Sequence, residues 1–167
     1  WGMRASLLAR AQDHDALQAL YAELSAGDRG QPDPSRRMLL GRMAEFLKRP
    51  AEAVDWYRGV AGGPEREEGR IRIAVALYEL GRIEQAYSEA HALQNDADSD
   101  GDARRHAYLL EGELRQRGGD AAGEIEALDR GLAAWPDDSA LLYARALAWE
   151  RQDRIDRAEA DLRKLLV

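Results

Sequence analysis

Apolar and small residues recur at helical spacing along most of this chain, and short polar stretches interrupt them. The segment 71–93 is the clearest case, because its apolar positions follow a helical period as far as Leu77, stop at Gly81 and resume at Ile83. This pattern predicts two helices joined by a glycine turn, which is a helical hairpin. A single hairpin cannot bury its own apolar face, so similar hairpins are expected beside it.

Similar segments do recur along the sequence. When they are aligned on Ala86, a small residue of the second helix, the matching positions are Ala53, Glu124 and Ala158. The spacings are 33, 38 and 34 residues, which gives a period of about 34, with about four residues inserted before Glu124. The pattern predicts a single array with a partial first hairpin at 1–26 and further hairpins at 35–61, 65–94, 103–134 and 138–167.

Composition agrees with a helical protein and narrows its function. Threonine is absent, and Ala, Leu, Arg and Glu, which favour helices, dominate the sequence. The net charge is −7, from 31 acidic and 24 basic residues. We expect no nucleic-acid partner, because such a partner requires a basic face. We also expect no direct membrane insertion, because no stretch approaches the ~20 apolar residues of a membrane helix.

The sequence offers little for catalysis. Cysteine is absent, which excludes disulfides, thiol nucleophiles and zinc–thiolate sites. The sequence contains no GxSxG, Walker or GxGxxG motif, and its three histidines form no close pair. We therefore expect that the protein is not an enzyme and uses no cofactor.

One acidic segment could bind a cation. Asp96, Asp98 and Asp100 alternate with other residues and are followed by a glycine, as in the opening of an EF-hand calcium loop. The twelfth position of that loop, which should be a bidentate glutamate, is Ala107. We predict no metal site and keep these three aspartates as a weak candidate, with a solvated loop as the alternative.

The repeats resemble the tetratricopeptide-repeat (TPR) family. The resemblance lies in Leu40-Gly41, in GRIEQA at 81–86, and in LDRGL at 128–132 followed by WPDD at 135–138. Lys48 and Asp153 depart from the family pattern, because they stand where a turn glycine is common. The resemblance implies an all-α fold: an α-solenoid of about five helix-turn-helix hairpins that forms a right-handed superhelix.

In the TPR family, the first helices of successive hairpins line a concave groove that usually holds a partner's peptide or helix. Carried over to this chain, the groove comprises Met38, Arg42, Phe46, Ile71, Val75, Tyr78, Tyr108, Arg115, Tyr143, Leu147 and Arg151. The helix with Tyr108 and Arg115 ends at either Gly118 or Gly119, and that choice moves its groove positions by one. The alternative role for the apolar members is packing against a neighbouring hairpin. Outside the groove, Tyr57, Leu77 and Trp149 are assigned to the core.

The resemblance also suggests what occupies the groove. The arginines of the groove could bind a partner's carboxylates through bidentate contacts. Chaperone-associated TPR domains clamp a C-terminal carboxylate with Lys and Asn side chains on these helices. That arrangement is excluded here, because the only asparagine is Asn95, in a loop.

These observations favour a non-catalytic scaffold or adaptor that binds a protein or peptide partner in the groove. The sequence is similar to bacterial TPR lipoproteins that act as adaptors for a periplasmic protease. That narrower resemblance implies the periplasm or the inner leaflet of the outer membrane, through a lipid anchor outside this chain, with the cytoplasm as the alternative. The sequence begins and ends within repeats, so we expect a longer protein, in which this chain could instead be a structural or self-associating segment.

Overall fold

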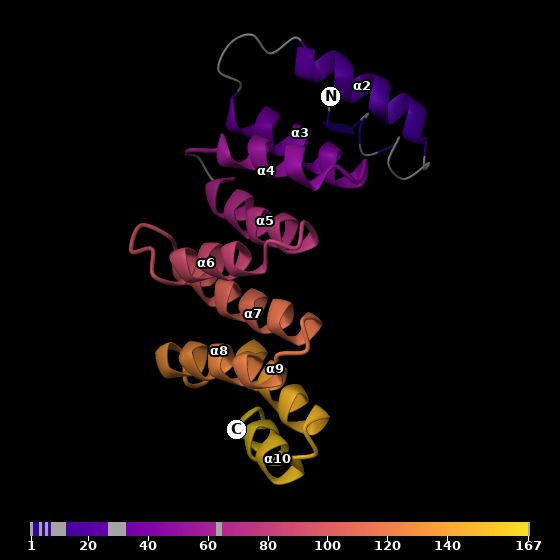
Figure 1. Cartoon of the computed structure of the whole chain (residues 1–167). Helices are drawn as coiled ribbons and strands as arrows, with labels where there is room; N and C mark the ends of the chain where they lie inside the picture. The colour runs from indigo at the N-terminus through magenta and orange to yellow at the C-terminus, as the bar shows by residue number, and fades with distance from the viewer. Residues whose placement is uncertain are drawn as a thin grey trace. The chain divides into compact units, whose positions relative to one another are not determined.

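The structure is a computed structural model that describes residues 2, 3, 5, 7, 13–26, 33–62 and 65–166. All regular elements in these residues are helices (Figure 1). None of the helices described is long and apolar enough to cross a membrane. The first helix predicted within 1–26 falls largely outside the described residues. The chain divides into two compact units, Trp1–Glu89 (unit 1) and Ala90–Val167 (unit 2).

In unit 1, helix α2 (His14–Ala26) precedes the first hairpin whose two helices are both described, and paired helices follow it. These are α3 (Pro34–Phe46), α4 (Pro50–Arg58) and α5 (Arg66–Glu79). Asp13 and Asp33 start α2 and α3, because each carboxylate accepts a hydrogen bond at 3.0 Å from the backbone N–H three residues later. Pro34 and Pro50 lie in the first turns of α3 and α4, where a missing N–H costs little. The next helix, α6 (Ile83–Gln94), spans the boundary between the units.

Unit 2 contains two hairpins. Its helices are α7 (Gly101–Arg117), α8 (Ala121–Ala134), α9 (Ser139–Arg151) and α10 (Ile155–Lys164). Asp100, Asp120 and Asp138 cap α7, α8 and α9, with hydrogen bonds of 2.6, 2.9 and 2.9 Å from the backbone N–H three residues later. The helices pair over residues 34–58, 66–94, 101–134 and 139–164.

In the part of the chain that the structure describes, each turn between the two helices of a hairpin contains a left-handed residue. These residues are Lys48, Gly81, Gly119 and Asp153, with φ of 58°, 72°, 76° and 57°. Glycine adopts this conformation without steric cost, whereas a side chain is strained there. The two departures from the glycine pattern therefore keep the backbone geometry of the glycine turns.

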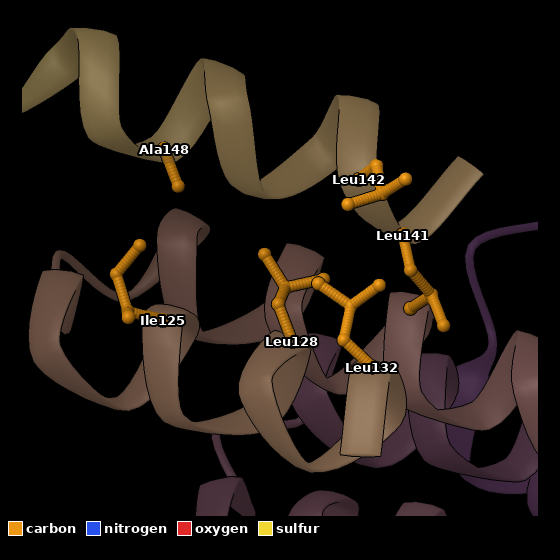
Figure 2. Close-up of a cluster of buried hydrophobic side chains, with 6 residues drawn as sticks. All are labelled: Ile125, Leu128, Leu132, Leu141, Leu142 and Ala148. Atoms are coloured by element: carbon orange, nitrogen blue, oxygen red, sulfur yellow. The ribbon is translucent and has the colours of Figure 1, made fainter. Parts of the chain in front are cut away.

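The core is built from the facing sides of paired helices. In unit 1, Tyr57 and Leu77 are buried, which confirms their assignment to the core. In unit 2, α8 contributes Ile125, Leu128 and Leu132 to a cluster that faces the apolar side of α9 (Figure 2). Trp149 packs against the edge of this cluster and is half-buried.

Candidate functional site

The left-handed turn residues fix the register of the predicted groove. The groove positions of α3, α5 and α9 include the residues ten and six before Lys48, Gly81 and Asp153. In α7 the left-handed residue is Gly119, whereas Gly118 has a φ of −79°. The equivalent positions in α7 are therefore Leu109 and Glu113. This corrects the predicted set, which contained Tyr108 and Arg115.

Tyr108 and Arg115 have other roles in unit 2. The ring of Tyr108 packs edge-on against Trp135, with 6.0 Å between the ring centroids. Arg115 Nε donates to Glu111 Oε1 at 3.0 Å, and its Nη1 donates to Asp120 Oδ2 at 2.6 Å. Both side chains are thus engaged within their own unit.

Unit 2 has a cavity of about 250 Å³ on the side of α7 and α9 that the corrected register identifies. We call it the unit 2 groove, and it is lined by Leu109, Gly112, Glu113, Gln116, Glu124, Leu128, Ala144, Leu147 and Arg151. The leucines and small residues form an apolar wall, and the longer polar residues complete the lining. Tyr143, which is 53% exposed, lies one helical turn before Leu147 on α9. The structure therefore brings Leu147 and Arg151 together with residues of α7 and α8.

An ion pair forms the polar part of the unit 2 groove. Arg151 Nη2 donates to Glu124 Oε1. The side chain of Glu124 is 8% exposed and that of Arg151 is 43% exposed. Burial raises the pKa of Glu124, and the positive charge of Arg151 opposes that effect. The guanidinium is therefore accessible from solvent while it neutralises a buried carboxylate.

Unit 1 has two cavities beside α3, of about 510 and 370 Å³. Arg42 lines both cavities and Phe46 lines the smaller one. Met38 lines the larger cavity and is only 3% exposed. The predicted residues of α5, which are Ile71, Val75 and Tyr78, are half-buried.

A network of ion pairs connects α3 and α5 at the smaller cavity of unit 1. Glu68 Oε1 accepts from Arg42 Nη2 at 2.6 Å and from Arg72 Nε at 2.9 Å. Arg72 Nη1 also donates to Glu45 Oε2 at 2.9 Å. Burial alone would raise the pKa of Glu68, but the hydrogen bonds from Arg72 and Arg42 outweigh it and lower that pKa. The three arginines predicted for the groove are thus all paired with carboxylates of their own unit.

Sequence reasoning missed the most buried charge in unit 2. Glu111 is fully buried and accepts hydrogen bonds from Gln94 Nε2 at 2.8 Å and Arg130 Nη2 at 2.7 Å. Its other oxygen contacts His91 Nε2 at 2.9 Å and Arg115 Nε at 3.0 Å. Burial alone would raise the pKa of Glu111, but the hydrogen bonds from Gln94 and His91 and the charge of Arg130 lower it. The sequence signal that could have predicted this buried charge is a glutamate within the apolar stripe of α7.

The acidic segment before α7 makes local hydrogen bonds. Asp100 caps α7, and Asp96 Oδ1 accepts a hydrogen bond from the Asp98 N–H at 3.0 Å. In the part of the chain that the structure describes, no group of three or more metal-ligating side chains could hold a metal ion. In this structure Asp96 and Asp100 thus each accept a hydrogen bond from the local backbone.

Comparison with known proteins identifies relatives of this chain. It is 31% identical over 124 residues to TPR repeat-containing protein PA4667 of Pseudomonas aeruginosa. That match covers 74% of this chain and 20% of the relative, so this chain spans about a fifth of the length of the relative. No protein-family model matches the chain.

Solved helical-repeat structures share the fold. A kinesin light chain with TPR-like repeats from Podosopora anserina matches with a TM-score of 0.68 and 15% identity, covering 98% of this chain and 90% of that one. BtubC from P. vanneervenii matches with a TM-score of 0.66 and 17% identity, covering 96% of this chain and 74% of that one. MamA from Desulfovibrio magneticus matches with a TM-score of 0.60 and 17% identity, covering 99% of this chain and 93% of that one. The paired helices define an all-α helical-repeat protein. The repeat period and the relative in Pseudomonas aeruginosa show that it belongs to the TPR family.

Proposed function

We propose that the chain is a non-catalytic scaffold or adaptor that binds a partner polypeptide on the concave side of its first helices. The observation that carries the proposal is the unit 2 groove, where an apolar wall from three helices lies beside a half-exposed arginine. Apolar clefts with a few polar groups are the usual form of a binding site. The TPR relatives form a scaffold family, which supports a binding function without catalysis.

The unit 2 groove favours a partner segment that presents an apolar side chain next to a carboxylate. Leu109 and Leu147, which are both half-buried, offer the apolar contact. The guanidinium of Arg151 has five N–H donors, so it can keep its bond to Glu124 and bind a second carboxylate. Unit 1 repeats this combination, because Arg42 lines both of its cavities and is already paired with Glu68.

Photo-crosslinking in cells that produce the full protein tests the proposal. One variant carries a photo-reactive residue at Tyr143, and the matched control carries it at Ala133, which is exposed on α8. We expect Tyr143 to capture a defined partner that Ala133 does not capture. Capture should weaken in Arg151→Gln and persist in Arg163→Gln, which removes an exposed arginine of α10.

Two results would contradict the proposal that the unit 2 groove binds a partner. The first is equal capture from Tyr143 and Ala133, which would indicate nonspecific contact. The second is capture that Arg151→Gln leaves unchanged although circular dichroism shows both variants folded. In either case the apolar wall would be a packing surface rather than a binding surface.

We also propose, from the narrower sequence resemblance, that the full protein is a periplasmic adaptor for a protease. Its support is the similarity of the helical repeats to bacterial lipoprotein adaptors. Fractionation of cells that express the tagged full-length protein checks the compartment. A tag found only in the cytoplasmic fraction would remove the periplasmic adaptor and leave the scaffold itself intact.

A further inference from the structure

Two carboxylates and a guanidinium are among the described residues that line the unit 2 groove. The side chain of Glu124 on α8 is 8% exposed and that of Arg151 on α9 is 43% exposed. A hydrogen bond from Arg151 Nη2 to Glu124 Oε1 joins them. Glu113 of α7 also lines the cavity, but its side chain is exposed and pairs with Arg117 at 2.5 Å. Glu124 is therefore the buried carboxylate of the groove.

The helices packed against α8 bring other charged groups near this site, and these have partners or lie in solvent. On α7, the guanidinium of Arg115 is held by two carboxylates of its own unit. On α9, Arg145 is held by two aspartates and Glu150 is exposed. The positive charge that lowers the pKa of Glu124 is that of Arg151. Glu124 thus depends on Arg151 to remain ionised while buried.

A partner carboxylate that binds Arg151 brings a second negative charge to the same guanidinium. Water is largely excluded from Glu124, so solvent screens the repulsion between the two carboxylates only weakly. When two carboxylates share one site, the pKa of one of them rises strongly. Burial already raises the pKa of Glu124 in the free protein, so Glu124 is the group that takes up a proton.

We propose that the unit 2 groove is a proton-linked carboxylate site, in which a carboxylate binds Arg151 as Glu124 takes up a proton from solvent. Arg151 then neutralises the bound carboxylate instead of Glu124. This inference rests on the proposed function and adds its regulation by pH. Affinity for the carboxylate should rise as pH falls and level off once Glu124 is protonated in the free protein.

Titration of the whole chain with N-acetyl-leucine, followed by nuclear magnetic resonance, tests the linkage. This probe carries an apolar side chain next to a carboxylate that stays ionised above about pH 5. Amide shifts of Gly112 and Ala144, which line the groove, report the dissociation constant. We expect binding to be at least about threefold tighter at about pH 5.5 than at about pH 8. N-acetyl-leucine amide, which lacks the charge, should bind more weakly and equally at both pH values.

A second acid identifies the source of the carboxylate. N-acetyl-aspartyl-leucine amide carries its carboxylate on a side chain, whereas N-acetyl-leucine carries it at the chain end. Comparison of their dissociation constants shows which of the two the groove prefers, and tighter binding in acid is expected for the preferred one.

Glu124→Gln separates proton uptake from a structural role. The amide resembles a protonated carboxyl group, so this variant should bind the preferred acid at about pH 8 at least about threefold more tightly than the unchanged chain. It should also lose the pH dependence. If Glu124 only positioned Arg151, the same change should weaken binding. The matched control is Glu126→Gln, which removes an exposed carboxylate of α8 and should have neither effect.

The outcomes distinguish this inference from the proposed function. Equal binding of the preferred acid at both pH values, or a pH dependence that persists in Glu124→Gln, would overturn the linkage and leave the carboxylate-binding groove intact. Shifts from neither acid at about 50 mM, or equal binding of N-acetyl-leucine and its amide, would contradict the carboxylate partner and this inference with it. Thermal melting monitors the fold of each variant. If Glu124→Gln does not fold, the comparison of acid and amide in the unchanged chain still decides.

Discussion

Gly41 of unit 1 and Gly112 of unit 2 occupy the same place in their hairpins, seven residues before the left-handed turn residue. Each glycine faces the large residue nine positions after that turn residue. A Cβ added at Gly41 would lie 2.6 Å from Tyr57 Cδ1, whereas a Cβ at Gly112 would lie 3.3 Å from Leu128 Cγ. A Cβ would therefore clash with the tyrosine ring in unit 1, whereas in unit 2 it would make a tight contact that a small shift of Leu128 can relieve.

The third hairpin of this kind extends the comparison. Its equivalent positions are Ala146, which is buried, and Leu162, which is 42% exposed. Leu162 is thus the counterpart of Leu128, but it is partly exposed where Leu128 is buried.

The two units also use buried charge differently. Glu68 of unit 1 binds two arginines and its side chain is 40% exposed. Glu111 of unit 2 contacts two arginines, His91 and Gln94 while its side chain is fully buried. Similar hydrogen bonds therefore carry different energetic weight, because water can replace a lost partner only at the exposed site.

The largest expected effect is from Glu111→Gln. The amide removes the negative charge and presents an NH₂ group to donors, so Arg115 and Arg130 lose a buried counter-charge. We expect unit 2 to lose about 3 kcal/mol, whereas Glu68→Gln should cost unit 1 less than about 1 kcal/mol. Peptide-resolved hydrogen exchange measures the opening free energy of each unit. Equal losses would show that burial does not separate the two carboxylates.

We expect the second largest loss of stability from Gly41→Ala. The added methyl group would overlap the buried ring of Tyr57, and we expect a loss of about 2 kcal/mol in unit 1. For Gly112→Ala we expect a change near zero, because a gain of up to about 1 kcal/mol in helix propensity offsets a small shift of Leu128. Urea unfolding followed by circular dichroism compares the two variants. If Gly112→Ala is destabilised and Gly41→Ala is not, the claim that the contact is tighter in unit 1 than in unit 2 is wrong.

Acid should weaken unit 2 through Glu111. Its pKa in the folded state is lowered, so its stabilising contribution is present above the unfolded value of about 4.3 and is lost as pH falls through the lowered folded value. Hydrogen exchange of unit 2 should therefore show less pH dependence below about 4.3 in Glu111→Gln than in the unchanged chain. An identical acid profile in both would mean that other carboxylates dominate.

The smallest expected effect lies in the turns. Lys48→Gly removes a side chain from a left-handed residue with φ of 58°, and we expect a gain of up to about 1 kcal/mol in unit 1. Asp153→Gly should gain less, because aspartate tolerates this conformation better. Gly81→Ala is the opposite control and should destabilise the chain. Thermal melting ranks the three variants, and a loss on Lys48→Gly would point to a side-chain role.

Much of the fold could be predicted from the sequence, because its signals are local. Helical periodicity and the glycine of the 81–86 motif predicted paired helices, and every regular element in the described residues is a helix. The candidate site was predicted less completely. Two adjacent glycines left the register of α7 open, and only the positive φ of Gly119 assigned Leu109 and Glu113 to the groove.

Residue patterning along the chain was enough to predict the TPR repeat, the all-α fold and the core residues Tyr57 and Leu77. These follow from spacing and from the preference of apolar residues for burial, which act within one repeat. Only the tertiary structure decided which charges are paired. Arg151 with Glu124, and Glu111 with Arg130, are 27 and 19 residues apart. Such pairs depend on how separate helices pack, and helical periodicity carries no information about the partner of a charge across that distance.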